Sequence, residues 1–66
     1  MIDEIGVSAG EIWAELEGNA QGLTLEQLKR KIKLPADLFF MGVGWLARED
    51  KLQFIETQST VRVSLK

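Results

Sequence analysis

The side chains best suited to chemistry in this 66-residue chain are a basic cluster and one further arginine. The cluster consists of Lys29, Arg30, Lys31 and Lys33, and the separate arginine is Arg62. Lysine and arginine contact nucleic-acid phosphates and gain affinity by releasing the counterions that surround them. We therefore expect these five residues to bind double-stranded DNA through its phosphates. The alternative interpretation is that cations at the end of a helix complement its dipole and stay solvated.

The residue types that catalysis and metal binding require are scarce. The chain has no cysteine and no histidine, which removes disulfides, thiolate chemistry, zinc sites and imidazole catalysis. Glu11 and Glu15 would share one face of a helix, but paired carboxylates need a substrate cleft that so short a chain hardly provides. We expect no catalytic residue, metal, cofactor or small-molecule substrate, and no enzyme activity.

The overall charge is acidic, with a net charge of −2 and a pI of about 5.0. A free-standing DNA-binding module is usually basic, so the total charge argues against DNA, although the local potential near the basic cluster favours it. The first residues lack the apolar core of a signal peptide, and no stretch is long and apolar enough to span a bilayer. The absence of cysteine fits a reducing compartment. We therefore expect a cytoplasmic protein without membrane contact.

Two capping-box patterns predict the first two helices. Ser8, paired with Glu11, predicts a first helix that runs to about Glu17. Thr24, paired with Gln27, predicts a second helix. This second helix should close just before the single proline, because proline disfavours a helical conformation at the residue that precedes it.

Residues 35–50 predict a third helix that is apolar nearly all round over its middle. Such a helix is normally covered on both sides. Gly42 and Gly44 each cost about 1 kcal/mol relative to alanine in a helix interior. Their presence so close together predicts tight packing at both positions.

An apolar patch is expected on this third helix at Phe39, Phe40 and Val43. Exposed patches of this kind mark association sites, so we expect an interface with a second copy or with another protein. The alternative is that Phe39 belongs to the core and the other two are partly covered. Apolar side chains suit direct base reading poorly, because base edges are read mainly by Arg, Lys, Asn and Gln.

Two strands are expected at the end of the chain. Apolar and polar residues alternate on either side of Thr57-Gln58-Ser59, between Leu52 and Leu65. Three helices followed by this hairpin predict an α+β winged helix-turn-helix that occupies residues 1–66 as a single domain. The residues expected in its core are Ile5, Ile12, Trp13, Leu16, Leu25, Leu28, Ile32, Leu34, Leu38, Trp45, Leu46, Phe54, Val61 and Val63.

A family resemblance supports the same fold. Residues 44–52 read Gly-Trp-Leu-Ala-Arg-Glu-Asp-Lys-Leu, and they follow Ile5-Gly6 and Ile12-Trp13. With this run, the chain resembles a family of small bacterial and archaeal winged helix-turn-helix domains of unassigned function over residues 5–65. The resemblance implies three helices plus a wing, and a role in DNA binding or transcription. It supplies no catalytic residues.

Two functional hypotheses follow from the sequence. The first is a small DNA-binding or transcription-associated module that acts as a dimer, motivated by the fold and the basic cluster. The second is a protein-interaction winged helix that dimerises or docks a partner through the third helix and never meets DNA. The second hypothesis predicts that Phe40→Glu or Val43→Glu breaks an assembly and leaves the monomer folded.

Overall fold

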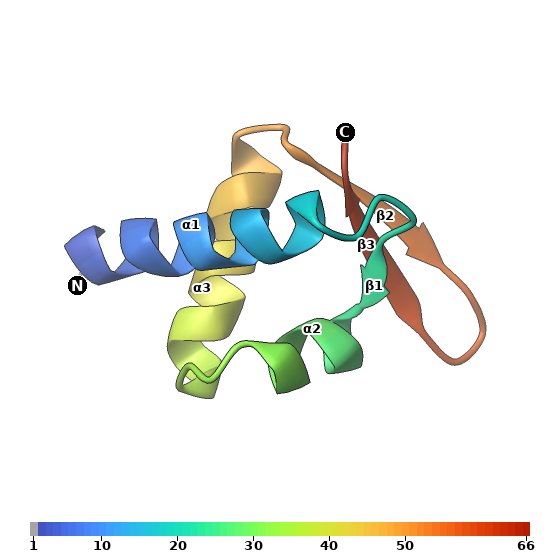
Figure 1. Cartoon of the computed structure of the whole chain (residues 1–66), viewed down its shortest axis with the longest axis horizontal. Helices are drawn as coiled ribbons and strands as arrows, with labels where there is room; N and C mark the ends of the chain where they lie inside the picture. Colours follow the sequence, from blue (N-terminus) through green and yellow to red (C-terminus); the bar gives the residue numbers. More distant parts are fainter. Residues whose placement is uncertain (1) are drawn as a thin grey trace.

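The computed structural model describes residues 2–66, which form three helices and a three-stranded antiparallel sheet (Figure 1). The helices are α1 (Ile2–Glu17), α2 (Leu25–Lys31) and α3 (Ala36–Arg48). The strands are β1 (Leu23–Thr24), β2 (Leu52–Glu56) and β3 (Val61–Leu65). This is the α+β winged helix-turn-helix expected from the sequence. The helix-turn-helix pair is α2 and α3, and the wing is the hairpin of β2 and β3.

The first helix begins earlier than the sequence predicted. α1 starts at Ile2, so Ser8 lies inside the helix and does not cap it. The Ser8 hydroxyl donates a hydrogen bond of 2.8 Å to the backbone carbonyl oxygen of Glu4. Serine in a helix interior often bonds to the carbonyl four residues earlier. The predicted start at Ser8 is therefore wrong, whereas the predicted end at Glu17 is confirmed.

The capping box predicted for the second helix is confirmed. The Thr24 hydroxyl oxygen accepts a hydrogen bond of 3.1 Å from the Gln27 backbone N–H. The Gln27 side-chain oxygen accepts one of 3.0 Å from the Thr24 backbone N–H. Because Thr24 is also the last residue of β1, this reciprocal cap fixes the point where the strand becomes α2.

The short strand β1 was not expected from the sequence, because two residues are too few to show a period. β1 pairs antiparallel with β3, Leu23 lying opposite Val63, so the strand order in the sheet is β1-β3-β2. Gly22 leads into β1 with a φ of 84°. A Cβ at this position would lie 2.5 Å from the carbonyl oxygen of Val63, so both the turn and the sheet require glycine here.

The wing is a regular hairpin whose turn is held by two threonines. The pairs run from Leu52 opposite Leu65 to Glu56 opposite Val61. The Thr57 backbone N–H donates a hydrogen bond of 2.8 Å to the Thr60 carbonyl oxygen. This hydrogen bond closes the turn around Thr57, Gln58 and Ser59, where the sequence predicts it.

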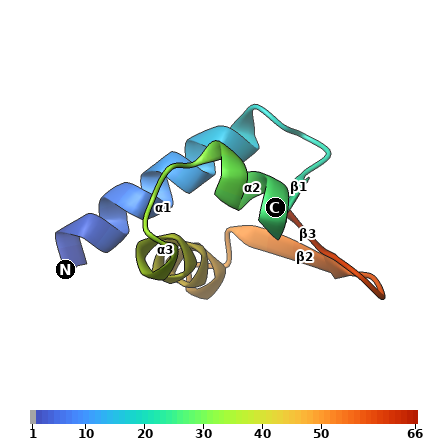
Figure 2. The ribbon, with the colours of Figure 1, turned by 90° about the horizontal axis from the view of Figure 1, so that it is seen from below.

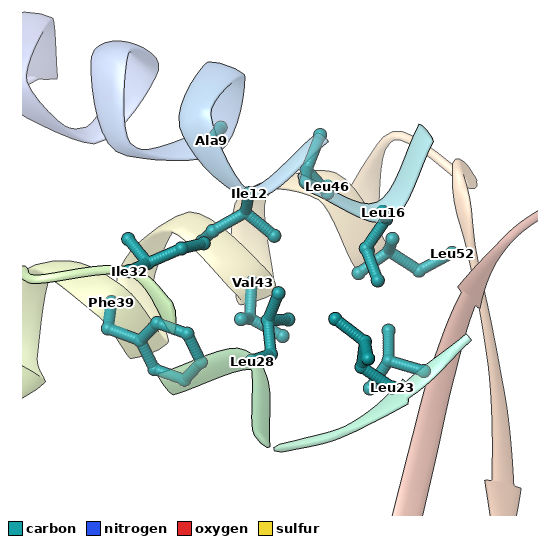
Figure 3. Close-up of a cluster of buried hydrophobic side chains, with 11 residues drawn as sticks. Ala9, Ile12, Leu16, Leu23, Leu28, Ile32, Phe39, Val43, Leu46 and Leu52 are labelled. Atoms are coloured by element: carbon teal, nitrogen blue, oxygen red, sulfur yellow. The ribbon is translucent and has the colours of Figure 1, made fainter. Parts of the chain in front are cut away.

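The core lies where the three helices meet the inner face of the sheet (Figure 3). Its buried residues are Ala9, Ile12, Leu16, Leu23, Leu28, Ile32, Phe39, Val43, Leu46, Leu52 and Val63. The remaining residues expected there divide into two groups. Those that are partly buried are Ile5, Leu25, Leu34, Leu38 and Val61. Those that are exposed are Trp13, Trp45 and Phe54, for which the prediction of a core position is wrong.

The crossing of α1 over α3 decides which side of α3 is buried (Figure 1). A Cβ on Gly42 would lie 2.9 Å from the Ile12 Cδ1 atom and 3.1 Å from the Ala9 backbone nitrogen. The two helices therefore touch at Gly42, as the sequence predicted. A Cβ on Gly44 would have no heavy atom within 4 Å, so the tight packing predicted there is absent. With Gly42 facing α1, the side chain of Trp45 is left on the flank of α3.

Candidate functional site

The apolar patch expected on α3 is largely inside the protein. Phe39 is 0% exposed and Val43 is 8% exposed, because both lie on the side of α3 that also carries Gly42 and Leu46. The prediction of a surface patch is therefore wrong for these two residues. Phe40 alone of the three is exposed, with its ring in edge-to-face contact with that of Phe39 at a centroid distance of 5.0 Å.

The placement of Val43 also changes the variants that test an interface. Val43→Glu would put a carboxylate among core residues, where an unpaired charge costs several kcal/mol by the usual estimates. We therefore expect this variant to unfold the monomer, contrary to the expectation from the sequence. Phe40→Glu keeps its value as a test, because the Phe40 side chain is already half exposed.

The surface side of α3 carries a different set of residues. A seam of exposed residues with spacings of four, three and four runs along it: Asp37, Met41, Gly44 and Arg48. Phe40 and Trp45 flank the seam and are also exposed. We call these six residues the α3 outer face. In Figure 2, where α3 is seen nearly end-on, α1 and α2 lie to one side of it and no described element covers the opposite side.

The α3 outer face is mostly apolar. Phe40 is 51% exposed, Met41 41% and Trp45 42%. The acid Asp37 and the base Arg48 lie at the two ends of the helix, and no asparagine, glutamine or lysine is present in α3. In a DNA-binding helix-turn-helix, this second helix enters the major groove and contacts base edges through polar side chains. The composition of the α3 outer face suits a protein surface better.

The sequence contains a periodic signal for this face. Positions that are four, three and four residues apart fall along one line of a helix surface. Starting the count at Asp37 selects the seam, whereas starting it at Phe39 selects the core side. Because α3 is apolar on both sides, the sequence alone does not decide between the two lines.

A hollow of about 400 Å³ lies beside the α3 outer face, between α2, α3 and the tip of the wing. Leu25, Phe40 and Val61 give it apolar walls, and the wing turn from Thr57 to Thr60 closes one side. Lys29 is the single basic residue of the predicted DNA-binding set that lines it. The hollow extends the apolar surface of α3 toward the wing.

The residues of the basic cluster point in several directions. Lys29, Arg30 and Lys31 are consecutive in the last turn of α2, and successive helical residues point about 100° apart. Lys33 follows in the turn before α3, and all four side chains are exposed. Within residues 2–66, no ion pair engages them. They are available to phosphates, but they do not form one basic surface beside α3.

Arg62 lies apart from the basic cluster. It is opposite Thr24 and Ile55 in the sheet, on the face turned away from the buried side chain of Val63. Its Nη1 atom donates a hydrogen bond of 3.2 Å to the carbonyl oxygen of Gly22. Part of this guanidinium therefore fastens β3 to the turn before β1. The structure does not bring the five predicted phosphate contacts together.

Metal-binding clusters and membrane-spanning helices do not occur in the described part of the chain. No group of three or more His, Cys, Asp or Glu residues that could hold a metal ion is present within residues 2–66. Over the same residues, every helix is too short or too polar to cross a membrane.

Comparisons with known proteins agree with this architecture. Residues 1–65 match the sequence model of the Winged helix-turn-helix domain (DUF2582). The chain belongs to this family. The uncharacterized protein MJ1608 of Methanocaldococcus jannaschii is 36% identical to this DUF2582 domain over 67 residues, covering 100% of this chain and 96% of that protein. The solution NMR structure of protein BT2368 from Bacteroides thetaiotaomicron has a TM-score of 0.82 and 28% identity, covering 96% of this chain and 76% of that one.

Proposed function

We propose that this DUF2582 domain docks a protein through the α3 outer face and does not read DNA sequence. The observation that carries the proposal is the exposure of Phe40, Met41 and Trp45 on the helix that a DNA-binding relative of this fold would place in the groove. Clustered exposed apolar residues mark association sites, and aromatic residues and methionine are enriched in protein interfaces. The sequence favours DNA binding, whereas the exposure of Phe40, Met41 and Trp45 supports the alternative of protein docking.

The free energy gained by burying these three side chains also favours protein docking over DNA reading. Full burial of one large apolar side chain contributes about 1.5–3 kcal/mol relative to full exposure. Phe40, Met41 and Trp45 are each about half exposed, so covering all three would contribute on the order of 3 kcal/mol or more. In a DNA groove, the same side chains would leave the polar base edges without hydrogen-bond partners.

A photo-crosslinking experiment tests the proposal in cells that produce the chain. Benzoylphenylalanine is placed at Met41, in the middle of the α3 outer face, and at Ala14 as the control, an exposed position on α1. We expect irradiation to give a protein adduct from position 41 and a much weaker one from position 14, because only the first lies in the docking surface. Adducts to nucleic acid from position 41, or equal protein adducts from both positions, would contradict the proposal.

Binding to duplex DNA is the second candidate function, because the fold and four exposed basic residues favour it. If α3 docks protein instead, a random-sequence duplex should show no saturable binding at about 50 mM salt, where phosphate contacts are strong. Fluorescence anisotropy of a labelled duplex measures this. Binding that weakens steeply with salt, and that is lost in the double variant Lys29→Glu/Arg30→Glu, would show that the basic residues contact phosphates after all.

A further inference from the structure

We propose that the partner of the α3 outer face is a second copy of this chain, with the two α3 helices packed antiparallel about a two-fold axis near the middle of the helix. This inference rests on the proposed function, since it names the protein that docks on α3. A two-fold interface must be complementary to itself, because the same surface serves both copies. The residues of the α3 outer face meet that condition in charge and in shape.

The charges at the two ends of α3 are opposite. Asp37 lies in the first turn and Arg48 in the last turn, about 16 Å apart at a rise of 1.5 Å per residue. Both side chains are exposed on the seam, and no ion pair engages Arg48 within residues 2–66. Antiparallel packing brings Asp37 next to the partner's Arg48 at both ends of the contact. A parallel arrangement would instead place like charges together.

The shapes in the middle of the face are also complementary. Met41 and Gly44 lie equally far from the middle of the seam, so antiparallel packing places Met41 over the partner's Gly44. A Cβ on Gly44 would meet no heavy atom within 4 Å, so no contact within residues 2–66 requires a glycine there. A glycine in an exposed helix costs about 1 kcal/mol relative to alanine. Close approach of a second helix gives this glycine a role, because the missing side chain leaves room for Met41.

The residues on either side of the seam, the spacing of the seam and the helix dipoles are all compatible with antiparallel packing. Phe40 and Trp45 lie on opposite sides of the seam, equidistant from its middle. The two-fold axis therefore places each Phe40 on the same side as the partner's Phe40 and each Trp45 on the same side as the partner's Trp45, and aromatic pairs add to the energy of area burial. The spacing of four, three and four residues is that of the seam between two packed helices. Antiparallel helices also place the positive end of one dipole beside the negative end of the other. One helix from each copy makes a small interface, so the dimer should be weak.

Sedimentation of charge variants tests the antiparallel arrangement. The protein is compared from about 10 µM to about 1 mM, a range in which small interfaces dissociate. We expect the wild type to dimerise, and Asp37→Arg and Arg48→Asp each to weaken the dimer about tenfold, because each puts two like-charged pairs at the interface. An equimolar mixture of the two variants should recover the affinity, and so should the double variant Asp37→Arg/Arg48→Asp. Glu11→Arg and Lys31→Asp change the charge equally at exposed positions outside the face and should have no effect.

A variant at Gly44 separates an effect on docking from an effect on folding. Gly44→Gln introduces a better helix former with a polar side chain, so the monomer should become more stable while dimerisation falls at least tenfold. Circular dichroism of each variant at low concentration confirms that the monomer is folded.

The outcomes distinguish this inference from the proposed function. A wild type that stays monomeric at about 1 mM, while a crosslinker at Met41 captures a different protein, overturns the dimer and leaves α3 as a docking surface. Dimerisation that is unchanged in both single charge variants overturns the antiparallel arrangement. Crosslinks from Met41 to nucleic acid overturn the proposed function together with this inference.

Discussion

Replacing Phe39 by alanine should lower the free energy of unfolding by about 3–5 kcal/mol. The Phe39 side chain is fully buried, and a Phe→Ala change in a core removes its transfer free energy and leaves a cavity. A chain of 66 residues has a total stability of about 3–10 kcal/mol at the usual value per residue. The variant should therefore lose between about a third and all of its stability, which urea denaturation followed by circular dichroism would show.

The neighbouring residue provides the matched control for this prediction. Phe40→Ala removes the same ring from a half-exposed position and loses the edge contact with Phe39, so it should cost about 1 kcal/mol. The difference between adjacent phenylalanines depends only on which side of α3 faces the core. Equal losses of stability for the two variants would mean that the assignment of the buried side is wrong.

Alanine at Gly42 and alanine at Gly44 should change stability in opposite directions. Both substitutions gain about 1 kcal/mol of helix propensity. At Gly42 the new methyl group would press on Ile12 and on the backbone of Ala9, and overpacking of this kind costs about 1–3 kcal/mol. At Gly44 the methyl group meets nothing, so the gain in propensity remains.

We therefore expect Gly44→Ala to be about 1 kcal/mol more stable than the wild type and Gly42→Ala to be up to about 2 kcal/mol less stable. Thermal denaturation at about 10 µM, where a weak dimer is dissociated, measures both variants under the same conditions. If Gly42→Ala is stabilised as much as Gly44→Ala, then α1 does not approach α3 at Gly42 and the described crossing is wrong.

The sequence predicts those parts of the fold that depend on neighbouring residues. The reciprocal bonds of Thr24 and Gln27 involve residues three apart, and the pattern alone located them. The same pattern at Ser8 and Glu11 predicts a wrong helix start, because the pattern does not show whether the residues before Ser8 are already helical. In the structure they are, and the Ser8 hydroxyl bonds back to Glu4.

The sequence could not show which face of α3 is buried and which is exposed. This helix is apolar on both sides, so periodicity does not show whether Phe39 or Phe40 points inward. The decision comes from α1, which approaches α3 at Gly42 and makes that side the buried one. Met41 and Trp45, which do not lie on the buried side, are then left exposed on the outer face. The basic cluster is evident in the sequence, and consecutive residues of a helix point about 100° apart. The structure adds that Lys33 lies beyond the end of α2, in the turn before α3.

The most direct test of the central claim, that α3 presents a surface for protein and not for DNA, is a map of backbone amide chemical shifts by NMR. Spectra are recorded as the protein is concentrated from about 10 µM to about 1 mM, and again as a duplex is added at about 50 mM salt. We expect concentration to move the signals of the α3 outer face, with Gly44 as the clearest reporter, while DNA moves none. Signals around Lys29 to Lys33 and Arg62 that shift with DNA, together with an α3 outer face that is indifferent to concentration, would contradict the claim.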